Sequence, residues 1–440
     1  MQKCKNPDFL TDILLDIANS IKDKSETEKI ILGDQNNPED IIEVVSLAAG
    51  YPGICVFLGY MDKVFPEDGW DVVAHDYLTD LISLIQTNKT YSLSLFNGLA
   101  GVLVALETCS RGGTRYTTII NQVLTLILEN YKHYLSEDLL KLKKEGVSAS
   151  EYDVISGWTG VGRTLLHFDQ ISNKGDISLK KALHDIAEYL LLVSSIDTLS
   201  NMPNWLISNE NLPLDIEKKT YKKGYFNSGM AHGISGVLAF LSILKKENYK
   251  IKNLELGIKN IQNWIFEKVK THKGIYYIPN VIENEVVRNE AFFNHRDAWC
   301  YGTPGVSRAI FLSGIALNDQ RVKMKALELF KTFFLRDEKD RKIISPTICH
   351  GYAGILMLTL RMYKDTNDRF LADKMHDILN EMLTFYSQLN FSKFNNYELI
   401  SGKIVEEKKV GLLEGSTGIA LVLISFIFGQ DSWDKIFLIS

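Results

Sequence analysis

The chain has 440 residues, of which 45% are apolar and 23% are charged, and its formal net charge is −5. These values are ordinary for a soluble globular protein, and they give no reason to expect a nucleic acid or an anionic membrane as the main partner. Met1–Asp23 has no sustained apolar core, so a signal peptide is not expected. The longest apolar run, Gly418 to Gly429, is shorter than the roughly 20 residues that a membrane-spanning helix needs. We therefore expect a cytoplasmic protein.

An internal repeat runs through the chain. Gly-x-x-Gly followed at once by Val or Ile and a mostly apolar segment occurs seven times, starting at Gly50, Gly98, Gly157, Gly233, Gly302, Gly351 and Gly415. One such turn would carry no information, but seven turns with the same sequel indicate a repeat architecture. The apolar segments predict helices that are buried all round.

Seven longer segments with apolar residues at helical spacing accompany these turns. They are Pro7–Asp23, Asp71–Gln86, Arg115–Tyr131, Ser178–Ser194, Asn253–Lys270, Asp319–Arg336 and Asn367–Leu389. In the fifth segment the apolar stripe is Leu254, Ile258, Ile261, Trp264, Ile265 and Val269. This pattern predicts helices with one solvated face.

The alternation of amphipathic and buried helices predicts an all-α ring with the buried helices inside, because closure removes the exposed ends of an open solenoid. The glycines permit a positive φ and a close approach of neighbouring backbones. All seven inner N-termini are expected to point to one end of the ring, where their unpaired N–H groups attract anions.

Three long connections interrupt the pattern. Lys132–Tyr152 and Ile196–Ser228 are polar or mixed and are expected at the mouth of the ring. Thr271–His295, which contains Gly274-Ile-Tyr-Tyr-Ile278, predicts a small β-containing insertion at 271–295. Because no linker rich in Pro, Gly or Ser divides the chain, we expect residues 1–440 to form a single domain.

The five cysteines have no spacing that suggests a disulfide framework. Cys4, Cys55 and Cys109 are expected to be incidental or buried residues. Cys300 and Cys349 differ, because each stands two positions before the first glycine of a turn, in consecutive repeats. This shared position favours their being neighbours in space despite their separation in sequence.

The residue immediately before each first glycine is polar in six of the seven turns. In chain order these residues are Ala49, Asn97, Ser156, His232, Tyr301, His350 and Glu414. One such position just outside each buried helix is the expected lining of a central cavity. Two thiolates and an imidazole suit zinc, and three protein ligands leave a fourth position for water or substrate. We assign Cys300, Cys349 and His350 as ligands, the alternative being two buried cysteines and a core histidine.

His232 occupies the same position as His350 and could be a fourth ligand, an acid/base group or a structural histidine. Asp153, four residues before Gly157, is expected to hold His232 in one tautomer. Arg296 could be a surface ion-pair partner or a clamp on developing negative charge.

Four blocks resemble the lanthionine synthetase C family, the lantibiotic cyclases and their LanC-like relatives. The blocks are Tyr-Asp-Val-Ile-x-Gly at 152–157, Gly-Met-Ala-His-Gly at 229–233, Arg-Asp-Ala-Trp-Cys-Tyr-Gly at 296–302 and Ile-Cys-His-Gly-Tyr at 348–352. The last two are specific, and with the glycine repeats the resemblance covers about residues 45–420. It implies an α/α toroid of seven helical hairpins, in agreement with the repeat count.

The resemblance also implies a site and a reaction. Cys300, Cys349 and His350 would bind one Zn²⁺ per chain. His232 and Asp153 would carry acid/base chemistry, and Arg296, Trp299 and Tyr301 would line the site. The reaction implied is the addition of peptide Cys thiols to dehydroalanine and dehydrobutyrine, which forms lanthionine and methyllanthionine rings in a dehydrated precursor peptide. The residues leave open whether His232 protonates the α-carbon, takes the thiol proton, or does both.

The resemblance further implies a precursor with a leader segment, a dehydratase and an ABC transporter as partners, with at most peripheral membrane association through them. Three alternatives remain from the sequence. One is a zinc-dependent thiol alkyltransferase similar to a prenyltransferase subunit. Another is a non-catalytic zinc- or glutathione-binding LanC-like scaffold with a closed site that includes His232. The third is an α/α-toroid glycosidase, for which Asp153 and Glu414 are the only carboxylates in the turn positions.

Overall fold

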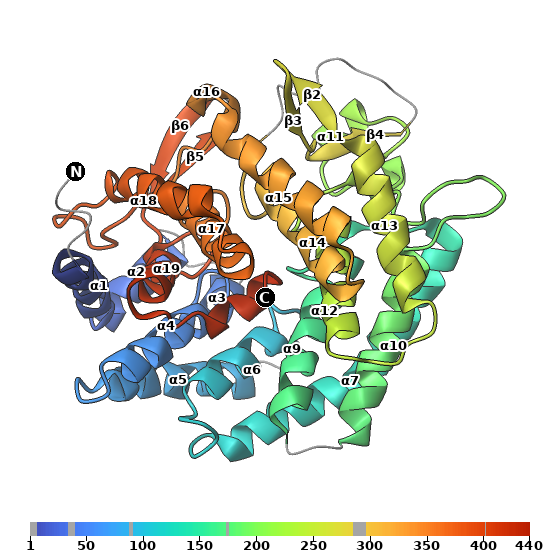
Figure 1. Ribbon diagram of the computed structural model, residues 1–440. Coiled ribbons are helices and arrows are strands. Elements are labelled where there is room, and N and C mark those ends of the chain that lie inside the picture. The colour runs from blue at the N-terminus through green and yellow to red at the C-terminus, as the bar shows by residue number, and fades with distance from the viewer. Residues whose placement is uncertain (1–6, 34–39, 88–90, 173–175, 285–295, 401) are drawn as a thin grey trace. The chain divides into compact units, whose positions relative to one another are not determined.

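The computed structural model describes residues 7–33, 40–87, 91–172, 176–284, 296–400 and 402–440. It is mostly helical, with three small two-stranded sheets among these residues (Figure 1). The chain forms two compact units, residues 1–125 with 344–434 and residues 126–343 with 435–440. The single-domain organisation of residues 1–440 stays a prediction.

The first unit holds four of the seven buried helices. These inner helices are α4 (Tyr51–Val64), α6 (Leu99–Thr108), α17 (Tyr352–Thr366) and α19 (Ser416–Phe428). They pack side by side in the order α17, α19, α4, α6, and α18 (Arg369–Leu383), α1 (Pro7–Ile21) and α5 (Trp70–Thr87) pack against the first three. The unit also contains α2 (Lys24–Leu32), α3 (Asp40–Val44) and a hairpin of β5 (Asn396–Ile400) and β6 (Lys403–Glu407).

The second unit holds the other three inner helices, α9 (Trp158–Ile171), α12 (Ile234–Lys246) and α14 (Thr303–Ala316). They pack in that order, and α10 (Ile177–Val193), α13 (Leu254–Lys268) and α15 (Gln320–Leu335) pack on them in turn. Its short elements are α8 (Ala149–Tyr152), η2 (Asn209–Asn211), α11 (Asp215–Thr220), α16 (Glu338–Arg341), β1 (Tyr225–Asn227), β2 (Lys270–His272), β3 (Ile275–Tyr277) and β4 (Val281–Glu283). Helix α7 (Thr117–Glu145) begins in the first unit and continues into the second, and η3 (Ser432–Phe437) ends the helical chain.

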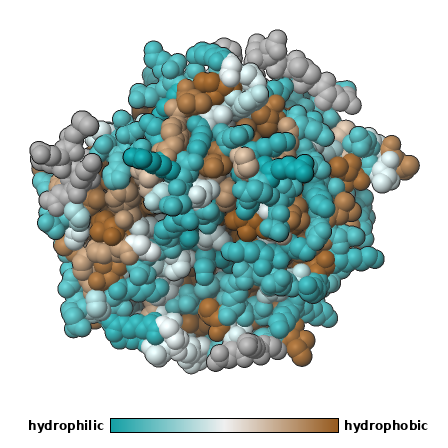
Figure 2. Space-filling model, in the orientation of Figure 1, coloured by the Kyte–Doolittle hydropathy of each residue, from teal (hydrophilic) through white to brown (hydrophobic). Residues whose placement is uncertain are grey.

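Burial agrees with the two predicted kinds of helix. Every residue of α19 from Ser416 to Ser425 is buried, whereas α13 buries Leu254, Gly257, Ile258, Ile261, Gln262, Trp264 and Ile265 and leaves its other face in water. The surface seen in Figure 2 is mostly hydrophilic, with hydrophobic residues in scattered spots. Among the described residues, no helix combines the length and the apolar character that crossing a bilayer requires.

Most glycines before the inner helices are needed because neighbouring backbone comes close to them, and not because their φ is positive. Of the seven first glycines, each at the N-cap of an inner helix, only Gly302 has a positive φ, at 78°. Five of the second glycines, Gly53, Gly101, Gly236, Gly305 and Gly418, meet a carbonyl oxygen six residues back. A Cβ would lie 2.1 Å from Trp299 O at Gly305 and 2.0 Å from Leu412 O at Gly418. At these five turns the preceding loop folds back onto the first helical turn, and a methyl group has no room.

Backbone hydrogen bonds join neighbouring turns at the position that holds the two cysteines. In the first unit the N–H of Cys349 donates to Leu413 O at 2.9 Å, the N–H of Leu413 to Ala48 O at 2.9 Å, and the N–H of Ala48 to Phe96 O at 3.2 Å. All four residues stand two positions before a first glycine. The alignment of the turns in sequence therefore corresponds to a real structural register.

The second unit repeats this register between the turns of Ala231 and Cys300, where the N–H of Ala231 donates to Cys300 O at 3.2 Å. In the turn before them the donor to Ala231 O, at 3.0 Å, is the N–H of Val154, which stands three positions before Gly157. Cys300 consequently follows the turn of His232 directly in space as well as in sequence order.

One local expectation needs correction, and one element is additional. Residues 132–145 continue α7 and are not a polar connection. They contain no Gly or Pro before Gly146, are rich in Lys, Leu and Glu, and bury Leu135 on the same face as Tyr131. The β5–β6 hairpin was not predicted, although Gly402, with φ +80°, stands between two β-rich segments.

The small β-containing insertion is present in the second unit. β2 pairs with β3, and β4 pairs with the distant β1, both antiparallel. Residues 285–295 of the predicted insertion lie outside the described residues.

Candidate functional site

The predicted site residues lie in two groups, one in each unit. The His232 group comprises Asp153, His232, Cys300 and Tyr301 in the second unit. The His350 group comprises Cys349, His350 and Glu414 in the first unit, with β5 beside it.

The His232 group is built on a histidine–carboxylate pair. His232 Nδ1 lies 2.6 Å from Asp153 Oδ2. The other oxygen of Asp153 accepts the N–H groups of Ser156 at 2.7 Å and Gly157 at 2.8 Å. Asp153 is 1% exposed while the His232 side chain is 42% exposed. A buried carboxylate thus fixes an imidazole whose outer edge stays accessible, and the pairing expected from the sequence is present.

The environment of His232 favours its charged form. Burial lowers the pKa of the imidazole, but the hydrogen bond and charge of Asp153, together with the charge of Cys300, outweigh burial and raise that pKa above its ordinary value. The proton on Nδ1 faces Asp153, so Nε2 is the nitrogen that can exchange a proton with a substrate.

Cys300 and Tyr301 lie against the His232 turn. The Cys300 carbonyl accepts the N–H groups of Met230 and Ala231, and the Cys300 side chain is buried. The Tyr301 ring lies beside His232, with the ring centroids 6.3 Å apart and the ring planes tilted by 33°. Asn227 Nδ2 donates to the Tyr301 hydroxyl at 3.2 Å.

Gly229 allows this packing, because a Cβ there would lie 2.6 Å from both Cys300 O and Tyr301 Cδ1. The spacing of the turns is therefore not the only requirement for the site: a residue without a side chain must also face the Cys300 carbonyl and the Tyr301 ring.

Trp299 is fully buried and anchors the end of the chain. Its Nε1 donates to Phe437 O at 3.0 Å, and its ring meets the Phe437 ring edge to face at 4.8 Å. These contacts give Trp299 a packing role, and its place as a site-lining residue stays a prediction. The role of Arg296, which is partly buried, also stays a prediction.

A buried ion pair that the sequence did not reveal supports the Cys300 turn. Asp297 Oδ2 lies 2.5 Å from Arg336 Nη1, and both side chains are almost wholly buried. Asp297 Oδ1 accepts the N–H of Thr303 at 3.0 Å, and Arg336 Nη2 donates to Thr303 Oγ1 at 2.8 Å. This network fixes the loop between Arg296 and α14, and removing either charge alone would leave the other buried.

The His350 group places a thiol, an imidazole and a carboxylate together. Ligand atoms of Cys349, His350 and Glu414 all lie within 4.8 Å of one another. Glu414 Oε1 lies 3.9 Å from His350 Nδ1. A thiolate and an imidazole are donors that zinc prefers, and a carboxylate is a common further one. The chemistry of this group therefore fits a zinc ion.

The far side of His350 is bound by β5. Its Nε2 lies 2.7 Å from Glu398 Oε1 and 3.2 Å from Asn396 Oδ1. Neither residue was expected from the sequence, where the only signal was the strand–turn–strand pattern around Gly402. In the sequence Glu414 stands out only as a carboxylate in a turn position. Nothing in the sequence indicates that it lies beside Cys349 and His350.

The remaining cysteines behave as expected. Cys55 and Cys109 are buried, and the Cys109 thiol donates to Cys55 O. Cys4 lies outside the described residues. Neither Cys55 nor Cys109 forms a disulfide within the described part of the chain.

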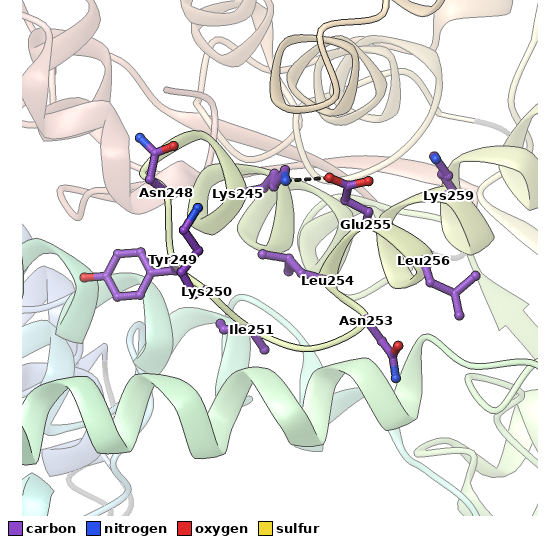
Figure 3. A pocket seen from close by; sticks show the side chains of 10 residues that line it. All are labelled: Lys245, Asn248, Tyr249, Lys250, Ile251, Asn253, Leu254, Glu255, Leu256 and Lys259. Atoms are coloured by element: carbon purple, nitrogen blue, oxygen red, sulfur yellow. Dashed lines mark hydrogen bonds and ion pairs between the residues drawn. The ribbon is translucent and has the colours of Figure 1, made fainter.

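A hollow of about 490 Å³ lies elsewhere, at the turn between α12 and α13 (Figure 3). Ten residues line it, namely Lys245, Asn248, Tyr249, Lys250, Ile251, Asn253, Leu254, Glu255, Leu256 and Lys259. Lys245 and Glu255 form an ion pair across it at 2.5 Å. None of the predicted site residues lines this hollow, so it is not the candidate site.

Comparison with known proteins agrees with this architecture. A sequence model of a family described as "Lanthionine synthetase C-like protein" matches residues 42–438. The nisin biosynthesis protein NisC of Lactococcus lactis subsp. lactis is 26% identical over 395 residues, which cover 87% of this chain and 85% of that protein. The solved structure of nisin cyclase matches with a TM-score of 0.78 at 22% identity and covers 96% of each chain.

The structural match confirms the expected fold class, an all-α α/α toroid with a small β-containing insertion. The sequence match extends over both units, from before the first glycine turn to beyond the last. The chain therefore belongs to the lanthionine synthetase C-like family.

Proposed function

We propose that this protein is a zinc-dependent lanthipeptide cyclase. It adds cysteine thiols of a dehydrated precursor peptide to dehydroalanine and dehydrobutyrine, and so forms lanthionine and methyllanthionine rings. Family membership and the similarity to a nisin biosynthesis protein support this reaction. The observation that carries the proposal is the buried Asp153 carboxylate holding an accessible His232 beside the Cys300 turn.

Cys300, Cys349 and His350 are the proposed zinc ligands. The shared position of the two cysteines in their turns and the donor types at Cys349 and His350 support this choice. A zinc ion there would lower the pKa of the substrate thiol, so that the nucleophile is a thiolate at neutral pH. Glu414 is a further donor close to this pair.

His232 moves the proton. As the thiolate sulfur bonds to the β-carbon, the π bond of the dehydro residue breaks and its electron pair passes to the α-carbon and carbonyl as an enolate. The His232 imidazolium then gives the Nε2 proton to the α-carbon. Asp153 keeps the Nδ1 proton in place and stabilises the cation. The proton released by the substrate thiol restores the imidazolium, so the whole reaction is an addition without change of mass.

Three neighbours complete the proposed site. The Tyr301 ring lies beside His232 and would limit the movement of the imidazole. Arg296 would stabilise the enolate oxygen as charge develops on it. Trp299 would shape the site wall through its contact with the chain end. The partners proposed from the family are a leader-bearing precursor, a dehydratase and an ABC transporter.

The test is incubation of the purified zinc-loaded protein with a dehydrated precursor peptide, followed by thiol alkylation and mass spectrometry. We expect alkylatable thiols to disappear while the peptide mass stays unchanged. In a parallel incubation that also contains an isoprenoid diphosphate, an added isoprenoid mass would indicate an alkyltransferase. Thiols that persist on every dehydrated precursor tried would support a non-catalytic scaffold. A glycosidase is disfavoured because both oxygens of Asp153 are already engaged by His232 and the turn backbone.

A further inference from the structure

The β5–β6 hairpin reaches the imidazole of His350 at Nε2, whereas Glu414 lies on the Nδ1 side of the ring. His350 is 2% exposed, so its ring orientation is set by protein contacts. Nε2 meets Glu398 Oε1 at 2.7 Å, and Asn396 Oδ1 stands 3.2 Å away. Both acceptors come from β5 (Figure 1).

These contacts determine which nitrogen carries the proton. A carboxylate oxygen and an amide oxygen both accept hydrogen bonds, so the proton between them and the ring lies on Nε2. Nδ1 then carries the lone pair, and Nδ1 is the nitrogen that faces Glu414. A carboxylate on the far nitrogen also makes an imidazole more basic and therefore a better metal ligand.

Other contacts hold the acceptors in place. Ser345 Oγ donates to Asn396 Oδ1 at 2.8 Å, and the N–H of Tyr397 donates to Ser345 Oγ at 3.3 Å. Across the hairpin, Asn396 Nδ2 donates to Glu407 at 3.3 Å. The strand is thus tied directly to the loop that precedes His350, and Glu398 is held at a fixed distance from the ring.

We propose that Glu398 is a positioning residue that fixes the tautomer and orientation of His350 for zinc binding. Asn396 supports it as a second acceptor. This inference rests on the proposed function, because it concerns the metal which that function requires. It assigns to the hairpin a role in metal binding in addition to its place in the fold.

The alternative is that Glu398 contributes only general negative charge or hairpin stability. Glu406 provides the matched control. It lies on β6 of the same hairpin and bonds Asn395 at 2.7 Å and Tyr397 at 2.9 Å. Glu406→Ala therefore removes one carboxylate and loosens the hairpin without removing an acceptor from His350.

The experiment measures zinc affinity by competition with a chromogenic chelator for the wild type, Glu398→Ala, Glu398→Gln and Glu406→Ala. We expect Glu398→Ala to weaken zinc binding about 10- to 100-fold, as loss of a partner to a ligating histidine does. Glu398→Gln keeps an oxygen acceptor and should lose less than Glu398→Ala. Glu406→Ala should stay within about twofold of the wild type, because it leaves the histidine contacts in place.

Cobalt substitution gives a second readout, since the ligand-field absorption of Co²⁺ reports the donor set and its geometry. We expect the Co²⁺ spectrum to change in Glu398→Ala and to be preserved in Glu406→Ala. Circular dichroism and urea unfolding establish that each variant is folded. Wild-type affinity and spectrum in folded Glu398→Ala would overturn the inference, as would an equal loss in Glu406→Ala. If the wild-type protein does not bind zinc stoichiometrically, the proposed function itself is contradicted.

Discussion

Replacing Asp153 by Asn tests the proton-transfer role of His232 with little change of shape. The Asn oxygen can still accept the N–H groups of Ser156 and Gly157, which Asp153 Oδ1 accepts now. The Asn NH₂ group would then face His232 Nδ1, where Asp153 Oδ2 lies at 2.6 Å. Two donors cannot share that contact, so Nδ1 must lose its proton and become the acceptor.

The expected effects on activity and stability differ in size. The substitution removes the negative charge that stabilises the imidazolium, and it moves the proton of the neutral ring from Nδ1 to Nε2. General acid catalysis by such a group accelerates a reaction about 10²–10⁴-fold. We therefore expect the cyclisation rate to fall by at least about 100-fold. One charge-assisted hydrogen bond is lost while two backbone bonds remain, so unfolding free energy should fall by only about 1–2 kcal/mol.

The assay is a single-turnover time course of thiol loss from a dehydrated peptide, with zinc content and urea unfolding measured in parallel. Tyr152→Phe is the neighbouring control, because the buried Tyr152 hydroxyl has no hydrogen-bond partner among the residues that the structure describes. It should keep the wild-type rate. A rate within about threefold of the wild type for folded, zinc-loaded Asp153→Asn would refute the proton-transfer role.

Three further predictions concern zinc binding, backbone packing and pH. Cys300→Ala and Cys349→Ala should each lose zinc and cyclisation together, as metal analysis will show; stoichiometric zinc in both would contradict the ligand assignment. Gly305→Ala should destabilise the protein by about 2 kcal/mol or more in urea unfolding, because its Cβ would lie 2.1 Å from Trp299 O; an unchanged midpoint would argue against the close approach.

Burial raises the pKa of Asp138 to about 6 despite its hydrogen bond from Trp158, so the folded state binds this proton more tightly than the unfolded chain does. The resulting stabilisation is lost as pH rises from about 4 to about 6. The unfolding free energy of Asp138→Asn, relative to that of the wild type, should therefore increase between pH 5 and pH 8. The increase should be about 1 kcal/mol, because Asp138 is only partly buried and solvent screens its charge. Parallel unfolding curves at the two pH values would contradict this.

The sequence predicts those features of the fold that depend on local chemistry. The seven turns can be recognised because each helix start needs glycines where the backbone folds back on itself, as at Gly305 and Gly418. The pairing of Asp153 with His232 can be expected for the same reason, since both stand at fixed positions in consecutive turns that are joined by backbone hydrogen bonds.

The contacts that depend on tertiary packing could not be predicted. Glu398 meets His350 only because β5 crosses beside the ring, and no periodicity links the two residues in sequence. The Asp297–Arg336 pair likewise joins a loop to the end of an outer helix. No spacing in the sequence links Asp297 to Arg336, and only the structure shows that the two charges are buried together.

The most direct measurement of the central claim is cyclisation of a dehydrated peptide in D₂O, followed by return to H₂O and mass spectrometry. Conjugate addition with protonation of the α-carbon predicts one non-exchangeable deuterium for each ring formed. In H₂O the same rings should form with no change of mass and with loss of alkylatable thiols. Ring formation without α-carbon deuterium would contradict the proton-transfer account, and the absence of rings would contradict the proposed cyclase.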